Sequence, residues 1–287
     1  MKKLDHIGLF ADLSKMDRLL LNYIKLLDDN FNFSKLTVIH YVALDAYSLE
    51  LQELIPELGE PFEDVLKKEI QSNINEIFGG PRDSIAVHIE SGGSVSKLVD
   101  YVNNQNFDLI VMGNKAHYKG SGSLGGKVVR LCNTNFMFIP ENSRPSIQKV
   151  VVPLDFSPYS GKAMEVALEI ANKTGSELLP ISVLKAAVRY FPYIKARPSV
   201  EKSLREKHQK TYSKLQKKLG IDAELEIIIP NDDEHTSKLI YDYALTNSAD
   251  MVVMGNKGRA DNEGLLIGSV TERLIANDKV LPVLVVK

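Results

Sequence analysis

Three glycines and a serine near the end of the chain have the spacing of a loop that could hold phosphate. Gly255 and Gly258 are separated by two residues, and after nine more the chain continues with Gly268-Ser269. The apolar run 251–254 comes before them and helical spacing follows, so the order is strand, loop and helix start. N–H groups at a helix start lack intrahelical partners, and glycine allows positive φ and close backbone approach to a ligand. The pattern predicts a phosphate cradle.

Charged side chains near this loop could complete such a site. Lys257 or Arg259 could supply positive charge to outer phosphates, or either could be a solvated loop cation. Asp155 follows another apolar run, and its carboxylate could accept hydrogen bonds from a ribose or a base amine. It could equally start a turn and cap a helix that begins near Ser157. The sequence leaves both alternatives open.

The same elements occur twice along the chain. The segment DMVVMGNK at 250–257 matches DLIVMGNK at 108–115, an offset of 142 residues. The stretch VVVPLDFSP around Asp155 matches HIGLFADLS around Asp12 with an offset of 143, and Ser-Lys-Leu at 96–98 matches Ser-Lys-Leu at 237–239 with an offset of 141. Offsets that agree to within two residues indicate duplication of one domain. We predict domains at 1–143 and 148–287, joined by a polar segment that contains Pro145.

Strand and helix patterns alternate within each copy. In the second copy, strands are expected at 149–154, 178–184, 225–229, 251–254 and 282–286, and helices from Ser157 and at 199–219, 236–244 and 270–276. In the first copy, 36–41 and 85–89 read as strands and 62–77 as a helix. The alternation predicts two tandem, open, five-stranded parallel sheets of the Rossmann-like α/β class, with helices on both faces.

The predicted sheet brings the candidate residues to one edge. Ligands of open parallel sheets bind outside the carboxyl ends of the strands, where the strand order reverses. Asp155 follows the first strand of the second copy, Val183 lies at the end of its second, and Gly255 follows its fourth. We therefore expect these three residues to face one ligand site.

These motifs resemble those of the universal stress protein family, over nearly the whole chain as two fused domains. The resemblance rests on the glycine pattern, on Pro153-x-Asp155 and on the final PVLVV run. It implies that the second domain holds ATP or AMP, with or without Mg²⁺, with Asp155 at the ribose and backbone near Pro153 and Val183 at the adenine. The candidate nucleotide-binding residues are Pro153, Asp155, Val183, Met254, Gly255, Lys257, Gly258, Gly268, Ser269, Val270 and Thr271.

The first copy departs from the family pattern. Gly113 and Gly126 keep the outer spacing, but Ala116 replaces the middle glycine and Lys127 replaces the serine. The methyl group of Ala116 would hinder close approach of a ligand to the backbone. Asp12 is retained at the ribose position. We expect this domain to bind nucleotide weakly or not at all and to have a structural or regulatory role.

Composition limits the function classes. The hydrophobic fraction of 44% and charged fraction of 25% are ordinary for a soluble globular protein. A net charge of −2 gives no reason to expect nucleic acid or an anionic membrane as a partner. Cys132 is the only cysteine, which excludes an intrachain disulfide and a CxxC metal site and is compatible with a cytoplasmic location. After the basic N-terminus, polar residues interrupt the apolar run that a signal peptide needs, so we expect no signal peptide. The run 280–286 is too short to span a bilayer.

Three functions remain open from the sequence. The leading hypothesis is a regulatory protein that binds adenine nucleotide, for which the resemblance implies a link to stress responses and a protein partner that the sequence does not name. The second is a slow ATPase or autophosphorylating enzyme, for which Ser269, Thr271 or Asp261 are candidates. The third is an interaction module without nucleotide. No Ser–His–Asp or Cys–His set converges on the predicted edge, so we expect neither catalytic residues nor a metal site.

The last strand of each copy generates a testable prediction about assembly. The runs 136–139 and 282–286 are apolar, and an apolar edge strand invites pairing. We expect the two copies to pair within one chain as a pseudo-dimer and two chains to associate further as a homodimer. Sedimentation velocity should show a species of twice the chain mass of 32.0 kDa. A strict monomer would contradict the second association step.

Overall fold

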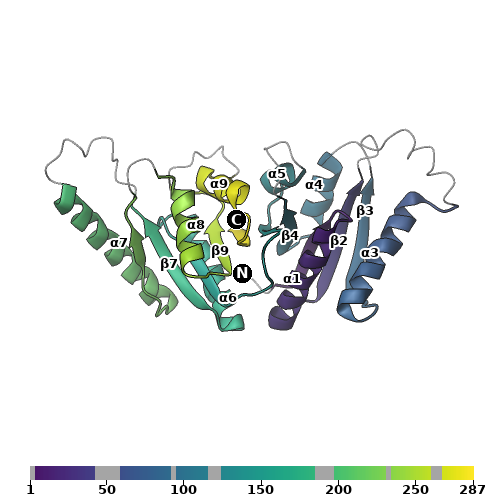
Figure 1. Cartoon of the computed structure of the whole chain (residues 1–287), viewed down its shortest axis with the longest axis horizontal. Helices are drawn as coiled ribbons and strands as arrows, with labels where there is room; N and C mark the ends of the chain where they lie inside the picture. The colour runs from purple at the N-terminus through teal and green to yellow at the C-terminus, as the bar shows by residue number, and fades with distance from the viewer. Residues whose placement is uncertain are drawn as a thin grey trace. The chain divides into compact units, whose positions relative to one another are not determined.

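The chain divides into two compact units, Met1–Ser146 (unit 1) and Ile147–Lys287 (unit 2). The computed structural model describes residues 4–42, 59–91, 95–115, 124–184, 197–230, 234–259 and 267–287. Figure 1 shows the strands and helices of both units.

Unit 1 is an open parallel sheet in which helices connect successive strands along the chain. Its strands lie in the order β3-β2-β1-β4-β5, and β1 pairs in parallel with both β2 and β4. The strand order therefore reverses at β1, which makes the carboxyl end of β1 the ligand edge of such a sheet. The elements are β1 (His6–Ala11), α1 (Lys15–Phe31), β2 (Lys35–Val42), α3 (Phe62–Phe78), β3 (Ile85–Ser91), α4 (Val95–Asn104), β4 (Leu109–Asn114), α5 (Leu124–Leu131) and β5 (Asn135–Pro140).

Unit 2 repeats this plan. Its strands lie in the order β8-β7-β6-β9-β10, and the order reverses at β6, which pairs in parallel with β7 and β9. The elements are β6 (Lys149–Pro153), α6 (Pro158–Thr174), β7 (Glu177–Val183), α7 (Arg197–Leu219), β8 (Glu226–Ile228), α8 (Thr236–Thr246), β9 (Met251–Gly255), α9 (Ser269–Asn277) and β10 (Val283–Val286).

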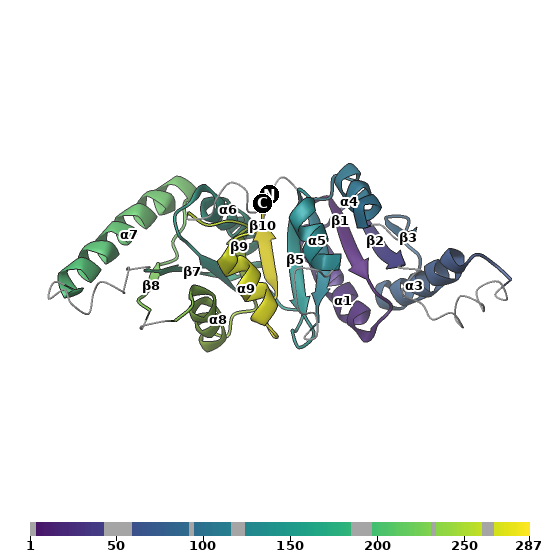
Figure 2. The ribbon, with the colours of Figure 1, turned by 90° about the horizontal axis from the view of Figure 1, so that it is seen from above.

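The predicted fold class is confirmed. Each unit has five parallel strands, and the expected elements agree with the observed ones to within two residues at each end. Figure 2 shows α1 and α3 on one face of the first sheet and α4 and α5 on the other. In unit 2, α6 and α7 cover one face while α8 and α9 cover the other.

The helices that cover both faces of each sheet explain why strands such as β6 and β10 are apolar along their length. Val150, Val151 and Val152 in the middle of β6 are fully buried, and all four residues of β10 are buried. A strand with helices on both sides has no solvent-facing side chains, so its sequence lacks the polar alternation of a half-exposed strand. The apolar core of each unit therefore lies along its sheet.

A left-handed turn follows the first strand of each unit. Leu13 and Phe156 have φ of 60° and 59°, which is uncommon for residues other than glycine. The carboxylates of Asp12 and Asp155 accept the N–H groups of the serines two residues later, at 3.2 and 3.0 Å, and so hold the backbone in this turn. Those serines then cap α1 and α6. The turn keeps each aspartate at the ligand edge.

Asp278 connects the last helix of unit 2 to the last strand. This residue follows α9, is 4% exposed, and its Oδ1 accepts the N–H groups of Val280 and Leu281 at 2.9 Å each. Burial raises the pKa of its carboxyl from 3.8 to about 6, although the backbone N–H groups favour the charged form. Unit 2 therefore contains a buried carboxylate that is costly to ionise.

This carboxyl predicts a pH-dependent stability. Folded Asp278 binds its proton up to a higher pH than the unfolded chain does, so its contribution to the free energy of unfolding falls as pH rises from 3.8 to about 6. Asp278→Asn keeps an oxygen acceptor and cannot ionise. We expect the variant to gain stability relative to the wild type between pH 4 and 7, by up to about 3 kcal/mol.

Urea unfolding at pH 4, 5, 6 and 7 measures this difference. Asp222→Asn, at an exposed position, controls for the loss of one negative charge. A stability difference between Asp278→Asn and wild type that is the same at every pH would contradict the prediction.

Candidate functional site

Gly255 ends β9 where the first turn of α6 crosses it. A Cβ atom added at Gly255 would lie 2.9 Å from the backbone carbon and the Cβ of Tyr159. Its φ is outside the left-handed region, and Gly268 also has a negative φ, −73°. Neither glycine therefore uses the positive φ that its residue type allows. Gly255 is required because the backbone of α6 leaves no room for a side chain.

The start of α9 presents backbone donors. Gly268 precedes the helix, and its N–H donates to the carbonyl of Asn256 at 2.6 Å. The first helical bond runs from Glu272 N–H to Gly268 O, so the N–H groups of residues 269–271 come before the hydrogen-bond ladder. These groups and the helix dipole favour an anion at this point.

The two hydroxyl groups at this helix start differ. Ser269 is exposed, whereas Thr271 is 3% exposed and donates its hydroxyl to the carbonyl of Gly255 at 3.0 Å. The Thr271 side chain therefore fastens α9 to the end of β9. Of the sequence candidates between Gly258 and Gly268, Asp261 lies outside the described residues.

Asp155 joins two loops at the ligand edge. Its Oδ1 accepts the N–H of Ser157, and its Oδ2 accepts the N–H of Arg259 at 2.6 Å. Arg259 also donates from its guanidinium to the carbonyl of Phe156 at 3.3 Å. Burial opposes ionisation of Asp155, but hydrogen bonds from Ser157, Ser160 and Arg259 outweigh it and lower the pKa of the carboxyl. Asp155 is thus a carboxylate at neutral pH, and the turn role is the one the structure shows.

The remaining candidates lie at the ends of neighbouring strands. Pro153 ends β6 and Val183 ends β7, both half-buried, and these strands pair in parallel. Met254 is 5% exposed in β9. The structure thus brings Pro153 and Val183 to the same edge as Asp155 and Gly255, while the Met254 side chain belongs to the core.

His208 on α7 is a residue of this edge that the sequence does not single out. Its Nδ1 lies 2.9 Å from the hydroxyl oxygen of Ser182, the residue before Val183. Its ring also meets the ring of Phe156 edge-on, with centroids 5.1 Å apart. His208 lies in a helix of mostly charged and exposed side chains, so local sequence gives no signal of these contacts.

At the corresponding edge of unit 1, side chains of that unit contact one another. The ammonium group of Lys115 forms an ion pair with Asp12. Burial opposes ionisation of Asp12, but the hydrogen bond and charge of Lys115 outweigh it and lower the pKa of the carboxyl. Asp17, 6% exposed, accepts the N–H groups of Asp12 and Leu13 at 3.1 and 2.8 Å, where unit 2 has Ser160. Burial raises the pKa of the Asp17 carboxyl.

The helix start in unit 1 differs from the one in unit 2. α5 begins at Leu124, so Lys127 lies inside the helix and not at the first helical position that Ser269 occupies in unit 2. Lys127, which takes the serine position of the motif by spacing, is the fourth residue of α5. Ala116 lies outside the described residues.

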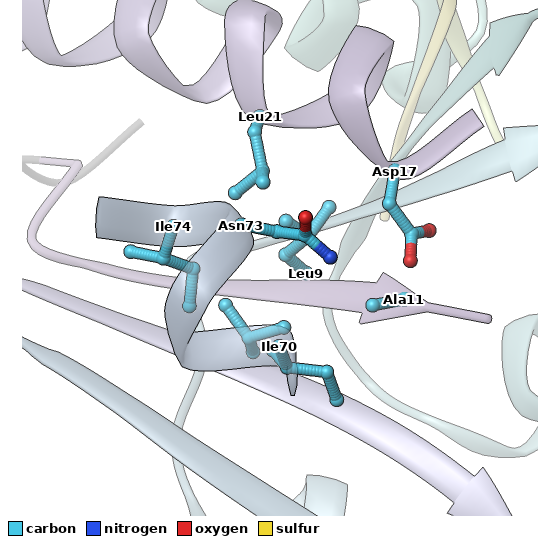
Figure 3. Close-up of a pocket in the computed structure, with 8 residues that line it drawn as sticks. Leu9, Ala11, Asp17, Leu21, Ile70, Asn73 and Ile74 are labelled. Carbon is cyan, nitrogen blue, oxygen red and sulfur yellow. The ribbon is translucent and has the colours of Figure 1, made fainter. Parts of the chain in front are cut away.

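A small pocket in unit 1 lies next to the carboxyl end of β1, where Ala11 and Asp17 line it. Figure 3 shows its lining, in which Asp17 and Asn73 are the polar side chains. The aliphatic side chains around them come from β1, β2, α1 and α3. The pocket has space for about one water molecule, far less than a nucleotide needs. The residues around it are Leu9, Ala11, Asp17, Leu21, Val38, Ile70, Asn73 and Ile74.

Comparison with known proteins identifies the family. The universal stress protein family matches the sequence twice, over residues 4–140 and residues 146–287. The chain belongs to this family. Both units are therefore universal stress protein domains, as the resemblance of the motifs implies.

Individual relatives agree with this membership. Universal stress protein MJ0531 of Methanocaldococcus jannaschii is 32% identical over 157 residues, which cover 52% of this chain and 87% of that protein. Universal stress protein Mb2019 of Mycobacterium bovis is 28% identical over 196 residues, 62% of this chain and 58% of that protein. A crystal structure of a universal stress protein from Archaeoglobus fulgidus DSM 4304 has a TM-score of 0.67 at 21% identity and covers 99% of this chain and 97% of its own. That likeness shows the fold.

The described residues of the two universal stress domains lack two further features. None of their helices is long and apolar enough to cross a membrane. Nor do three or more His, Cys, Asp or Glu side chains gather there in a group that could hold a metal ion.

The contact at Gly255 predicts a large loss of stability on a small substitution. In Gly255→Ala, the new methyl group meets backbone atoms of Tyr159, so α6 or β9 must move. We expect the free energy of unfolding to fall by about 1–3 kcal/mol, measured by urea unfolding.

Gly161→Ala is the matched control. Gly161 lies inside α6 in the same unit, and an added Cβ there meets nothing within 4 Å. Because alanine favours helix more than glycine does, this variant should gain about 0.5–1 kcal/mol. Equal effects of the two substitutions would show that the contact with Tyr159 is not what excludes a side chain at Gly255.

Proposed function

We propose that the protein is a regulatory protein that binds an adenine nucleotide, ATP or AMP, in unit 2. The observation that carries the proposal is the start of α9, where the N–H groups of residues 269–271 precede the helical ladder. Asp155 lies at the same edge, joined to the loop after β9 through Arg259 N–H. Donors for phosphate and a carboxylate for a sugar therefore converge at the reversal of strand order.

Each part of the nucleotide has a candidate partner. The phosphates would accept from the N–H groups at the start of α9 and from the exposed Ser269 hydroxyl, with Lys257 supplying charge. Asp155 accepts one N–H on each oxygen, and a carboxylate has further lone pairs that could accept the ribose hydroxyls. The base would lie at the ends of β6 and β7, near Pro153 and Val183.

Unit 1 is proposed not to hold nucleotide. Lys115 pairs with Asp12, so a ligand hydroxyl would have to compete with an internal cation. The carboxylate of Asp17 already takes the N–H groups of Asp12 and Leu13, and it would repel an incoming anion. We assign this unit a structural or regulatory role.

Regulation fits unit 2 better than catalysis does. An autophosphorylating enzyme needs an acceptor beside the terminal phosphate. The Thr271 hydroxyl is buried and donated to Gly255 O, and the exposed Ser269 hydroxyl is proposed as a donor to phosphate. In a regulator, the ligand acts by binding one conformation more tightly than another. Following [γ-³²P]ATP for released phosphate and for labelled protein distinguishes the two functions, and sustained turnover would favour the enzyme.

The proposal is tested by identifying and titrating the nucleotide. Denaturing protein purified without added nucleotide and analysing the supernatant by HPLC and mass spectrometry should release ATP or AMP at about one equivalent per chain. Stripped protein would then be titrated with each nucleotide, with and without Mg²⁺. Gly258→Ala should weaken binding, because a methyl group would be added in the proposed cradle.

The duplicated chain offers a matched pair of variants. Asp155→Asn removes the charge proposed to meet the ribose, and we expect roughly 10- to 100-fold weaker binding of ATP. Asp12→Asn makes the same change in unit 1 and should alter affinity less than about twofold. Equal losses in both variants would place nucleotide in both units, and no loss in either would refute the assignment of Asp155.

A further inference from the structure

The hydroxyl of Ser182 in unit 2 takes part in two hydrogen bonds. Its Oγ lies 2.7 Å from the carbonyl oxygen of Leu154 and 2.9 Å from Nδ1 of His208. Ser182 is 1% exposed, whereas His208, which reaches it from α7, is half-buried. Among the residues that the structure describes, Ser182 is the one hydrogen-bond partner of the His208 imidazole ring.

These two bonds determine the tautomer of His208. A carbonyl oxygen cannot donate, so the single proton of the Ser182 hydroxyl must point to Leu154. The Ser182 oxygen can then only accept from His208, and Nδ1 must carry the ring proton. In neutral His208 the lone pair is therefore on Nε2, on the other side of the ring from Ser182.

The surroundings of His208 favour its neutral form. Burial lowers the pKa of the imidazole, and the positive charges of Arg259 and Lys207 lower it further. Its other contacts, Ser182 from β7 and Phe156 from the turn after β6, are uncharged. At neutral pH the ring therefore keeps an acceptor at Nε2.

The His208 ring lies beside the strand ends where the base of the proposed nucleotide would bind. Ser182 immediately precedes Val183 at the end of β7, and Phe156 immediately follows Asp155. The rings of Phe156 and His208 meet at 89°, so His208 is fixed beside both loops. A fixed acceptor at the base end of a nucleotide site can distinguish bases by the groups on their edge.

We propose that His208 is a specificity-determining residue, whose Nε2 accepts a hydrogen bond from the 6-amino group of the purine. A 6-oxo purine presents an oxygen at that position, and its lone pairs would face the lone pair of Nε2. The site would thus select a 6-aminopurine nucleotide over a 6-oxopurine nucleotide. This inference rests on the proposed binding of nucleotide by unit 2.

The test compares ATP with inosine triphosphate, which carries oxygen in place of the 6-amino group. His208→Asn keeps an amide N–H that can donate to Ser182, so the link between α7 and β7 is preserved while the Nε2 acceptor is lost. Wild type should prefer ATP, and the preference should fall by roughly 3- to 10-fold in the variant. The urea midpoint of the variant checks that the fold is retained.

The pH dependence of the same ratio separates base recognition from a purely structural role. Below its lowered pKa, His208 gains a proton on Nε2 and becomes a donor, which suits the 6-oxo base. The ratio of ATP to inosine triphosphate affinity should therefore fall in wild type as the pH is lowered from 7.5 through the pKa of His208, and it should stay constant in His208→Asn. Both ligands carry the same phosphates, so phosphate titration and its effect on Arg259 and Lys207 cancel in the ratio.

The outcomes distinguish this inference from the proposal on which it rests. If wild type binds neither nucleotide, the proposed function and the role of His208 both fail. If wild type binds ATP but His208→Asn leaves the preference unchanged, or wild type keeps one ratio at every pH, the role of His208 is overturned and nucleotide binding stands.

Discussion

The hydrogen bond from Arg259 N–H to the carboxylate of Asp155 joins two loops that are 104 residues apart in the chain. One loop follows the central strand β6 and the other follows its neighbour β9, so the bond closes the edge at which the strand order reverses. The same carboxylate accepts the N–H of Ser157, the residue that caps α6. Phe156, with its left-handed backbone, lies between Asp155 and Ser157. Since Asp155 must be ionised for these bonds to be strong, the hydrogen bonds that lower its pKa also maintain the geometry of the edge.

The two units satisfy the same backbone groups with different side chains. Strand pairing matches His40 on β2 to Ser182 on β7. His40 is 6% exposed and its Nδ1 lies 2.9 Å from the carbonyl of Ala11, whereas in unit 2 the shorter Ser182 reaches the carbonyl of Leu154. The serine oxygen is then available to His208, so unit 2 has an imidazole at its edge where unit 1 has one in its core.

Features carried by local sequence could be predicted from it. Apolar runs predicted the buried strands and Ser157-Pro158 predicted the start of α6, because both depend on neighbouring residues. Matching segments at nearly constant offsets predicted the duplication. The reason for Gly255 and the contacts of His208 could not be predicted. They depend on Tyr159 and Ser182, which are distant in sequence and whose types carry no signal of the contact. The ion pair of Asp12 with Lys115 likewise joins residues 103 apart.

The constraints at Gly255 suggest how a ligand could act on the whole of unit 2. The hydroxyl of Thr271 donates to the carbonyl of Gly255 and so holds α9 against β9. Gly255 itself has no room for a Cβ, because α6 crosses it. A phosphate at the start of α9 would thus act on a helix whose position is tied to β9 and, through β9, to α6. Closely packed elements of this kind move together or not at all, because neither contact has space to absorb a shift. Binding energy at the loop would therefore favour one arrangement of α6, α9 and the strand between them, which is what a regulator requires of its ligand.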